Sequence, residues 1–152
     1  MPLHPASRLL CAALLSAACG GVAERPVSPE LPGPLVGHFV DDYGEERTVS
    51  SRRWTPHRGT ALVVERWSVG EQWLLLRHPE SALWTRVDWV ELDDAEWRWA
   101  FCLTSWDQPS AAAALREGTG VADRTNPRVG CNGSPFTRMR TRWKGVEEVS
   151  GA

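Results

Sequence analysis

The stretch at residues 84–106, W-T-R-V-D-W-V-E-L-D-D-A-E-W-R-W-A-F-C-L-T-S-W, decides the fold of this chain. Polar residues alternate with aromatic and β-branched ones over residues 84–92 and again over residues 97–106, and the acidic segment at residues 93–95 separates the two runs. Such alternation around a short turn predicts a β-hairpin. By the two-residue period of a strand, the second run places four apolar side chains on one face, which we expect to pack in a core. These side chains are Trp97, Trp99, Phe101 and Leu103.

Further short strands are expected along the rest of the chain. A turn at residues 43–45 joins two of them, and the β-branched run at residues 60–69 is typical of a central strand. With the hairpin they make about seven strands, the others lying at residues 35–42, 46–51, 60–69, 72–77 and 135–144. Strands joined mainly by short turns predict an all-β, mainly antiparallel fold, either a small barrel or a sandwich.

One short helix is expected at residues 109–117, between Cys102 and Cys131. This stretch reads P-S-A-A-A-A-L-R-E, and its four alanines favour a helix. Ser110 can accept a hydrogen bond at the start of the helix, and Gly118 can end it. We therefore expect a β domain that carries a single helix late in the chain.

The N-terminus has the pattern of a bacterial lipoprotein signal. Arg8, an apolar run at residues 9–15 and small residues at 16–18 lead to Cys19, and the apolar run is too short to span a membrane. The small-small-Cys ending resembles the lipoprotein box, in which the cysteine becomes the first residue of the mature chain and carries the acyl groups. The alternative is an ordinary secretory signal cleaved nearby, which would leave Cys19 as a free thiol. We expect residues 1–18 to be removed and Cys19 to be acylated.

The segment after the lipidation site predicts a tether. Residues 19–34 contain four prolines and little to bury, and at about 3 Å per residue they would hold the domain roughly 30 to 45 Å from the bilayer. The β domain is expected at residues 35–144, followed by a flexible tail at residues 145–152. Gly20 stands where an Asp would indicate retention in the inner membrane, so the outer membrane is the expected location.

The four cysteines support an exported protein. Cys11 leaves with the signal and Cys19 takes the lipid, so Cys102 and Cys131 remain as a pair in an oxidising compartment. A disulfide between them closes a loop of about 30 residues and would contribute roughly 3 to 4 kcal/mol of stability. A metal site is the alternative, although two cysteines without a nearby histidine fall short of a zinc ligand set.

The net charge does not indicate a nucleic-acid partner, and the sequence motifs do not indicate an enzyme. The formal net charge is −2, which does not favour a polyanionic partner. His38, His57 and His78 lie on separate segments without metal-ligand spacing, and no serine has a G-x-S-x-G setting. We therefore expect no catalytic residue, no metal and no cofactor.

Several motifs follow one another in a distinctive order. Residues 84–89 read W-T-R-V-D-W, the aromatic run after them ends in a cysteine, G-C-N-G surrounds Cys131, and residues 37–44 read G-H-F-V-D-D-Y-G. This order resembles a family of small exported bacterial proteins, many of them lipoproteins, that have a W-[ST]-R-x-D-W motif, a spaced cysteine pair and no assigned activity. The resemblance spans residues 37–138 and departs from the family pattern at residues 77–83. It implies a compact disulfide-linked β domain and carries over no catalytic residue.

The W-T-R-V-D-W motif offers a candidate binding site. Arg86 and Asp88 lie two residues apart on one face of a strand, where they can form an ion pair bracketed by Trp84 and Trp89. One interpretation is an anchor for a polar ligand at a barrel mouth. The other is a partly buried pair whose members satisfy each other under tryptophans and organise the structure.

The last strand predicts a positive stripe. Its basic side chains share one face, and Thr137, Met139, Thr141 and Trp143 share the other. The basic residues are Arg138, Arg140, Arg142 and Lys144. The stripe would contact anionic lipid headgroups, lipopolysaccharide phosphates or an acidic envelope protein. The alternative is an edge strand whose charges prevent pairing between sheets.

Three function classes follow from these features. The first is an envelope lipoprotein that acts as a non-enzymatic binding or structural module at the membrane surface. The second is a small β-barrel carrier with an apolar ligand or a sugar in a tryptophan-lined mouth. A hydrolase is the third and the weakest, because the sequence contains no legible nucleophile–base pair. A barrel interior filled with side chains would argue against the carrier.

Overall fold

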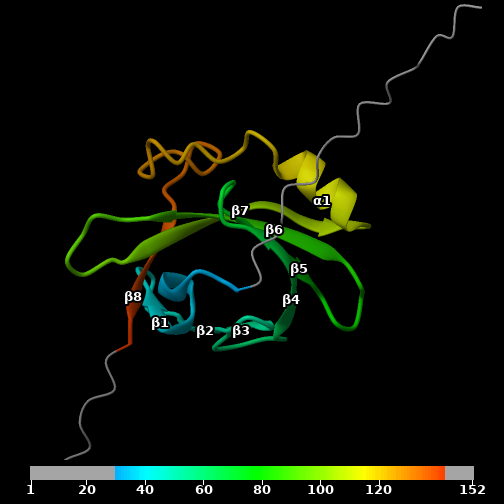
Figure 1. Ribbon diagram of the computed structural model, residues 1–152, viewed down its shortest axis with the longest axis horizontal. Coiled ribbons are helices and arrows are strands. Elements are labelled where there is room, and N and C mark those ends of the chain that lie inside the picture. The colour runs from blue at the N-terminus through cyan, green and yellow to red at the C-terminus, as the bar shows by residue number, and fades with distance from the viewer. Residues whose placement is uncertain (1–29, 143–152) are drawn as a thin grey trace, which may run out of the picture.

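The computed structural model describes residues 30–142, which form a closed barrel of eight antiparallel strands with one α-helix on its outside (Figure 1). The strands follow one another around the barrel in chain order, and the last pairs with the first. This arrangement confirms the predicted mainly antiparallel β fold with one short helix. Of the two predicted architectures, a small barrel or a sandwich, the domain has the barrel. The signal, Cys19, most of the predicted tether and the tail lie outside the described residues.

Seven of the eight strands fall where sequence alternation predicts them. The pattern does not predict β3, because its four residues bury a single side chain, Trp54, and end in a proline. The elements are η1 (Gly33–Leu35, a 3-10 helix), β1 (Gly37–Asp41), β2 (Glu46–Val49), β3 (Arg53–Pro56), β4 (Leu62–Ser68), β5 (Trp73–Arg77), β6 (Trp84–Glu91), β7 (Trp99–Gln108), α1 (Ala111–Gly118) and β8 (Thr137–Thr141).

Side chains fill the interior of the barrel. Trp99 is fully buried near the centre, where it makes edge-on contacts with Phe39 and Trp54 at ring-centroid distances of 5.3 and 6.1 Å. The buried cluster draws on every strand, its other large members being Leu35, Leu74, Leu76, Trp89, Phe101 and Met139. Eight strands enclose a space just wide enough for side chains to fill, and these aromatic and aliphatic residues occupy it. The barrel interior therefore holds a packed core.

The β6–β7 hairpin confirms the predicted hairpin, but its apolar face is only partly a core face. Trp99 and Phe101 are buried inside the barrel, as expected. Leu103 is 46% exposed, because it lies on that face near an uncovered end of the barrel. Trp97 precedes β7 and is only half-buried, and its ring packs on the guanidinium of Arg138 at 4.6 Å. The expectation that all four side chains pack in the core is wrong for these two.

The segment that enters the barrel closes one of its ends. η1 lies across the ring of strands in Figure 1, and Leu35 within it is fully buried in the barrel core. Leu31 packs in the same core, and the indole nitrogen of Trp67 donates to the carbonyl of Glu30 at 3.2 Å. Leu31, which lies within the predicted tether, therefore takes part in the packed core four residues before the predicted start of the domain.

A substitution in this plug tests the part that Leu31 takes in the core. We expect Leu31→Ala to lower the free energy of unfolding by about 2 kcal/mol, because it removes a side chain that fills the end of the core. Val36, which is 45% exposed, supplies the matched control, and Val36→Ala should change stability by less than about 0.5 kcal/mol. Urea unfolding followed by tryptophan fluorescence measures both. Equal effects of the two changes would contradict the assignment of Leu31 to the core.

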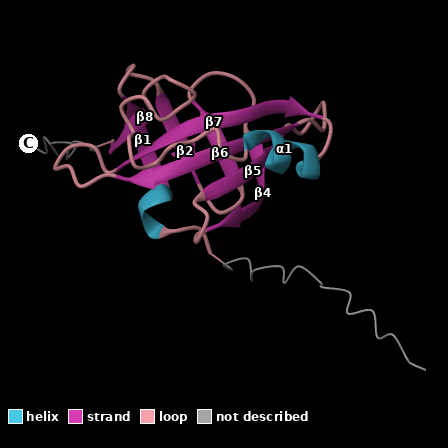
Figure 2. Cartoon of the chain, turned by 90° about the horizontal axis from the view of Figure 1, so that it is seen from above, coloured by secondary structure: helices cyan, strands magenta, loops and turns pink. Residues whose placement is uncertain are grey.

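A second layer covers one outer wall of the barrel. α1 lies against the outside of β5, β6 and β7 (Figure 2), where Ala114 packs with Trp73 and Leu75. The predicted helix is confirmed, and Ser110 caps it by accepting a hydrogen bond from the backbone N–H of Ala113 at 3.1 Å. The segment between α1 and β8 is joined to β7 by a disulfide. Both faces of β7 are consequently buried over much of its length.

Candidate functional site

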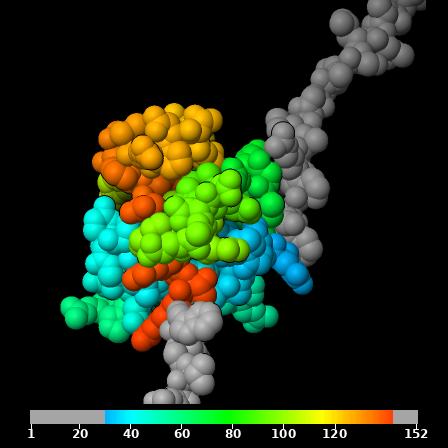
Figure 3. Space-filling view, turned by 90° about the vertical axis from the view of Figure 1, so that its left-hand side faces the viewer, coloured from blue at the N-terminus to red at the C-terminus, as the bar shows by residue number. Residues whose placement is uncertain are grey.

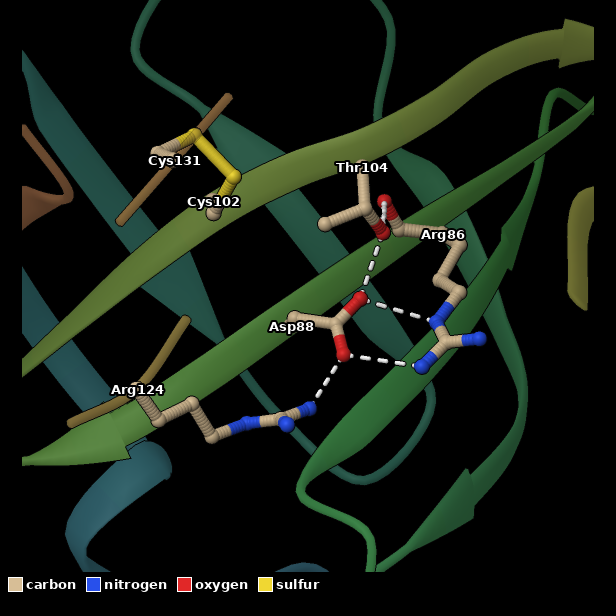
Figure 4. Close-up of a disulfide and its surroundings, with 6 residues drawn as sticks. All are labelled: Arg86, Asp88, Cys102, Thr104, Arg124 and Cys131. Atoms are coloured by element: carbon tan, nitrogen blue, oxygen red, sulfur yellow. Dashed lines mark hydrogen bonds and ion pairs between the residues drawn. A yellow bond between two sulfur atoms is a disulfide. The ribbon is translucent and has the colours of Figure 1, made fainter. Parts of the chain in front are cut away.

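A buried network of charges lies on the outer wall of the barrel (Figure 4). Arg86 donates to both carboxylate oxygens of Asp88, from Nε at 2.8 Å and from Nη2 at 2.9 Å. The hydroxyl of Thr104 donates to the same carboxylate at 2.5 Å, and Arg124 forms a second ion pair with it. Asp88 is 1% exposed and Arg86 8% exposed. The predicted ion pair is thus present, and it is sealed from solvent.

Arg124 connects this network to other parts of the chain. Its guanidinium donates to the backbone carbonyls of Glu71, Gln72 and Trp89 at 2.7, 3.0 and 3.1 Å. Arg86 similarly donates from Nη1 to the carbonyl of Leu115 in the last turn of α1, at 2.9 Å. The two arginines thereby fasten the segment after α1, and α1 itself, to the barrel wall.

The network is a structural device. The carboxylate of Asp88 accepts hydrogen bonds from three side chains, so a ligand would have to displace an existing partner. The interpretation of Trp84, Arg86, Asp88 and Trp89 as one ligand mouth is wrong in geometry. Trp84 packs beside α1 on the outer wall, Arg86 and Asp88 are covered there, and Trp89 points into the barrel core on the opposite face.

The predicted disulfide joins Cys102 of β7 to Cys131, with 5.5 Å between the Cα atoms (Figure 4). Cys102 is buried beside Ala100 and Phe136, in a small apolar cluster outside the barrel. The segment around Cys131 is tight, since a Cβ placed on Gly130 would lie 1.9 Å from the carbonyl oxygen of Asp123. Both sulfurs are used in this bond, so the alternative of a metal bound by these cysteines is not realised.

The positive stripe is present on β8, but acids neutralise it. Arg138, Arg140 and Arg142 are exposed on the outer face, and Met139 between them is fully buried. Lys144 and Trp143 lie outside the described residues. Each arginine has a carboxylate partner from elsewhere in the chain: Asp42 for Arg138 at 3.1 Å, Glu96 for Arg140 at 2.9 Å and Glu46 for Arg142 at 2.5 Å. The stripe therefore presents less positive charge than the sequence predicts.

The alternative explanation of the stripe, an edge strand, is wrong. β8 pairs with β7 on one side and with β1 on the other, so it closes the barrel. The loop between β6 and β7 lies over β8 (Figure 3), where Trp97 contacts the guanidinium groups of Arg138 and Arg140. The charges on β8 hold neighbouring segments in place at short range.

The same loop is ordered by an acidic turn residue. The carboxylate of Asp94 accepts the backbone N–H groups of Trp97 at 3.0 Å and Glu96 at 2.8 Å. These hydrogen bonds lower the pKa of Asp94, the one from Trp97 most. Because the pKa of Asp94 is lower in the folded state than in the unfolded state, ionised Asp94 stabilises the folded protein at any pH above its unfolded-state pKa. This stabilisation is lost as the pH falls through the folded-state pKa of Asp94.

The end of the barrel opposite η1 is open. η1 precedes the start of β1, whereas the opening lies where β3 and β5 end and where β4 and β6 begin. Neighbouring strands run in opposite directions, so the ends of β3 and β5 and the starts of β4 and β6 all lie at the same end of the barrel. This is the end at which β1 finishes, at Asp41. A hollow of about 350 Å³ occurs there. Its apolar lining consists of Trp54, Pro56, Leu62, Leu76, Phe101, Leu103 and Trp106.

Two of these side chains belong to the exposed large apolar residues of the described domain. Trp106 is 62% exposed and Leu103 is 46% exposed, while Trp54, Leu76 and Phe101 beneath them are buried. Trp54, Phe101 and Leu76 also belong to the core, so the floor of the hollow is the top of the packed interior. Exposed apolar side chains gathered around a concave site are typical of binding surfaces. Sequence alternation places Leu103 and Trp106 in a strand but does not show that this end stays uncovered.

A buried ion pair lies at the side of the opening. Asp41 is 2% exposed, and its carboxylate accepts hydrogen bonds from the backbone N–H groups of Tyr43 and Glu45 and from Nη2 of Arg47 at 3.0 Å. The guanidinium of Arg47 lies over the ring of Phe101, 5.2 Å from its centroid. Its Nε is buried without an acceptor among residues 30–142. Arg47 therefore brings hydrogen-bond donors to a hollow whose other polar lining residues are Thr60, His78 and Thr85.

The three histidines of the domain stay on separate elements. His78 lines the opening, whereas His38 bonds Thr48 at 2.9 Å and His57 lies 3.9 Å from Glu46. Nδ1 of His78 accepts backbone N–H groups from Glu80 and Ser81 at 3.3 Å each, so the proton of the neutral ring lies on Nε2. Within residues 30–142, no group of three or more His, Cys, Asp and Glu side chains could hold a metal ion.

Comparisons of the chain with protein-family models, curated proteins and solved structures gave no match. Between residues 30 and 142, no helix is long and apolar enough to cross a membrane.

Proposed function

We propose that this protein is an exported bacterial lipoprotein, attached to the outer membrane through acylated Cys19, and that it serves as a non-enzymatic binding module. One observation supports the binding role above the others. The barrel is filled and closed at the end where the chain enters, whereas the opposite end keeps Leu103 and Trp106 exposed around a hollow. A protein gains nothing in stability from leaving large apolar side chains in water, so a partner for this surface is expected.

The position of the opening fits an anchored protein. The described chain begins at Glu30, beside Trp67, and passes through η1 at the closed end. A tether running from Cys19 to that end would leave the opening on the side of the barrel away from the attachment point. The site would then remain accessible to ligands while the acyl chains hold the protein at the bilayer.

The filled interior favours this proposal over a carrier that encloses its ligand. A carrier barrel needs an interior cavity, and here aromatic and aliphatic side chains occupy the barrel centre. A sugar or an apolar ligand would instead bind in the mouth, across the buried Trp54 and Phe101. Contact of the β8 arginines with anionic lipid or an envelope protein is the weaker proposal, because their carboxylate partners would first have to be displaced.

The anchor is tested by substituting its cysteine. We expect the wild-type protein to be recovered in the outer-membrane fraction and to incorporate radiolabelled palmitate, and Cys19→Ser to abolish the label and release the protein from the membranes. Cys11→Ser is the matched control, because Cys11 lies in the predicted signal and should not affect either result. A Cys19→Ser chain that still labels and stays with the membranes would contradict the proposal.

A further inference from the structure

We infer that the open end of the barrel binds a small apolar carboxylate, with the hydrocarbon on the aromatic floor and the carboxylate beside Arg47 and His78. This inference rests on the proposed binding function and specifies its ligand. It follows from the size of the hollow, the nature of its floor and the sign of the polar groups around it.

The size of the hollow limits the ligand to a small molecule. A hollow of about 350 Å³ lies at the lower end of the range of about 300 to 1,000 Å³ that is typical of small-molecule sites. The packed core blocks deeper entry, because Trp54, Leu76 and Phe101 form the floor and are themselves buried core residues. A medium-length hydrocarbon chain or an aromatic ring can cover this floor, whereas a two-chain phospholipid cannot fit.

Apolar contact would supply most of the binding free energy. Leu103 and Trp106 flank the floor and are largely exposed, so a hydrocarbon placed between them would remove their apolar surface from water. Trp106 also offers a flat face of low conformational freedom, which suits an aromatic or an extended aliphatic ligand. Neither side chain belongs to a buried core cluster of residues 30–142.

The charges around the hollow select an anion. None of the described residues that line it is acidic, and Arg47 is its charged member. Arg47 is paired through Nη2 with Asp41, whose carboxylate also accepts two backbone N–H groups, so Arg47 would hold a ligand carboxylate through N–H groups that this pair does not use. The hydrogen bonds described for the Arg47 guanidinium use Nη2 alone, which leaves donor capacity for a ligand.

His78 adds a second hydrogen-bond donor to the same site. The backbone N–H groups of Glu80 and Ser81 fix Nδ1 as an acceptor, so Nε2 carries the proton and can donate to a ligand oxygen. A cationic head group would meet Arg47 and a histidine N–H and find no carboxylate in the lining. The arrangement therefore discriminates between acids and amines of equal chain length.

A second hollow on the molecule provides an internal comparison. It measures about 500 Å³ and contains Asp42, Asp93 and Asp94 together with Arg128 and Arg138. Its carboxylates disfavour an anion, and Asp42 already pairs with Arg138. Tyr43 is an exposed aromatic residue that lines the second hollow, as Trp106 is at the open end.

The test uses decanoate and the chain from residue 19 to residue 152 carrying Cys19→Ser, so that no acyl group competes for the site. Isothermal titration should show saturable binding to one site, and decylamine should bind at least about tenfold more weakly, a difference of roughly 1.4 kcal/mol. Because the assay contains no membrane, its outcome does not depend on the anchor. A negative result in the Cys19 experiment would therefore argue against the lipid anchor alone, and a negative result in this titration would argue against the ligand site alone.

Variants locate the binding. Leu103→Asp places a negative charge on the exposed rim and should weaken decanoate binding at least tenfold, and Trp106→Ala should weaken it severalfold. Val129→Asp and Tyr43→Ala are the matched controls, because both residues are exposed and neither lines the hollow. Circular dichroism confirms that each variant is folded. Absence of saturable binding, equal binding of decylamine, or equal effects of Leu103→Asp and Val129→Asp would each overturn the inference.

Discussion

Asp88→Ala is expected to lower the free energy of unfolding by about 3 to 5 kcal/mol, which is a large part of the stability of a domain of this size. The substitution removes the carboxylate that accepts hydrogen bonds from Arg86, Thr104 and Arg124. Arg86, at 8% exposure, would then be a buried cation without a counter-ion, and the cost of its desolvation would no longer be offset. Arg124 is more exposed and keeps its bonds to backbone carbonyls.

Urea unfolding followed by tryptophan fluorescence measures this loss, with Asp93→Ala as the matched control. Asp93 is an exposed acid in the loop that follows β6, so its removal should change stability by less than about 0.5 kcal/mol. The double substitution Arg86→Met with Asp88→Leu should be less damaging than Asp88→Ala alone, because it removes both buried charges together. An Asp88→Ala protein as stable as the Asp93→Ala control would show that the network does not stabilise the fold.

Replacement of Cys102 and Cys131 with serine is expected to cost about 3 to 4 kcal/mol. The two cysteines are separated by 29 residues, and a crosslink over this separation reduces the entropy of the unfolded chain by an amount that corresponds to this free energy. The segment that they fix also carries Arg124, so its release would loosen the anchoring of that segment to the barrel.

The disulfide itself is identified by mapping peptides under reducing and non-reducing conditions, which should show Cys102 joined to Cys131 in the exported protein. Thermal or urea unfolding then measures the stability of the double serine variant. Cys19→Ser is the control in the non-acylated protein, because Cys19 lies outside the described residues and belongs to the predicted tether, and its replacement is expected to leave stability unchanged. Free thiols at both positions, or equal stability of the double variant and the control, would contradict the prediction.

The candidate site could be predicted from the sequence only in fragments. The i, i+2 spacing of Arg86 and Asp88 predicts their ion pair, since both side chains lie on one face of a strand. The third member, Arg124, lies 36 residues further along the chain, and no local pattern connects it to them. Local sequence patterns do not predict the opening either, because a strand has the same alternation of apolar and polar residues whether or not its end is covered by another segment.

The sequence by itself determined seven of the eight strands, the helix with its Ser110 cap, the disulfide pair and the basic face of the last strand. Each of these depends on the periodicity of a short segment or on the chemistry of its residue types. Only the tertiary structure decided that β8 pairs with β1, with Asp41 opposite Met139. It also decided that Asp42, Glu46 and Glu96 neutralise the arginines of β8, and that one end of the barrel is closed while the other is open. The physical reason is that a local pattern specifies the face on which a side chain lies, whereas the segment that meets this face is chosen by the packing of the whole chain.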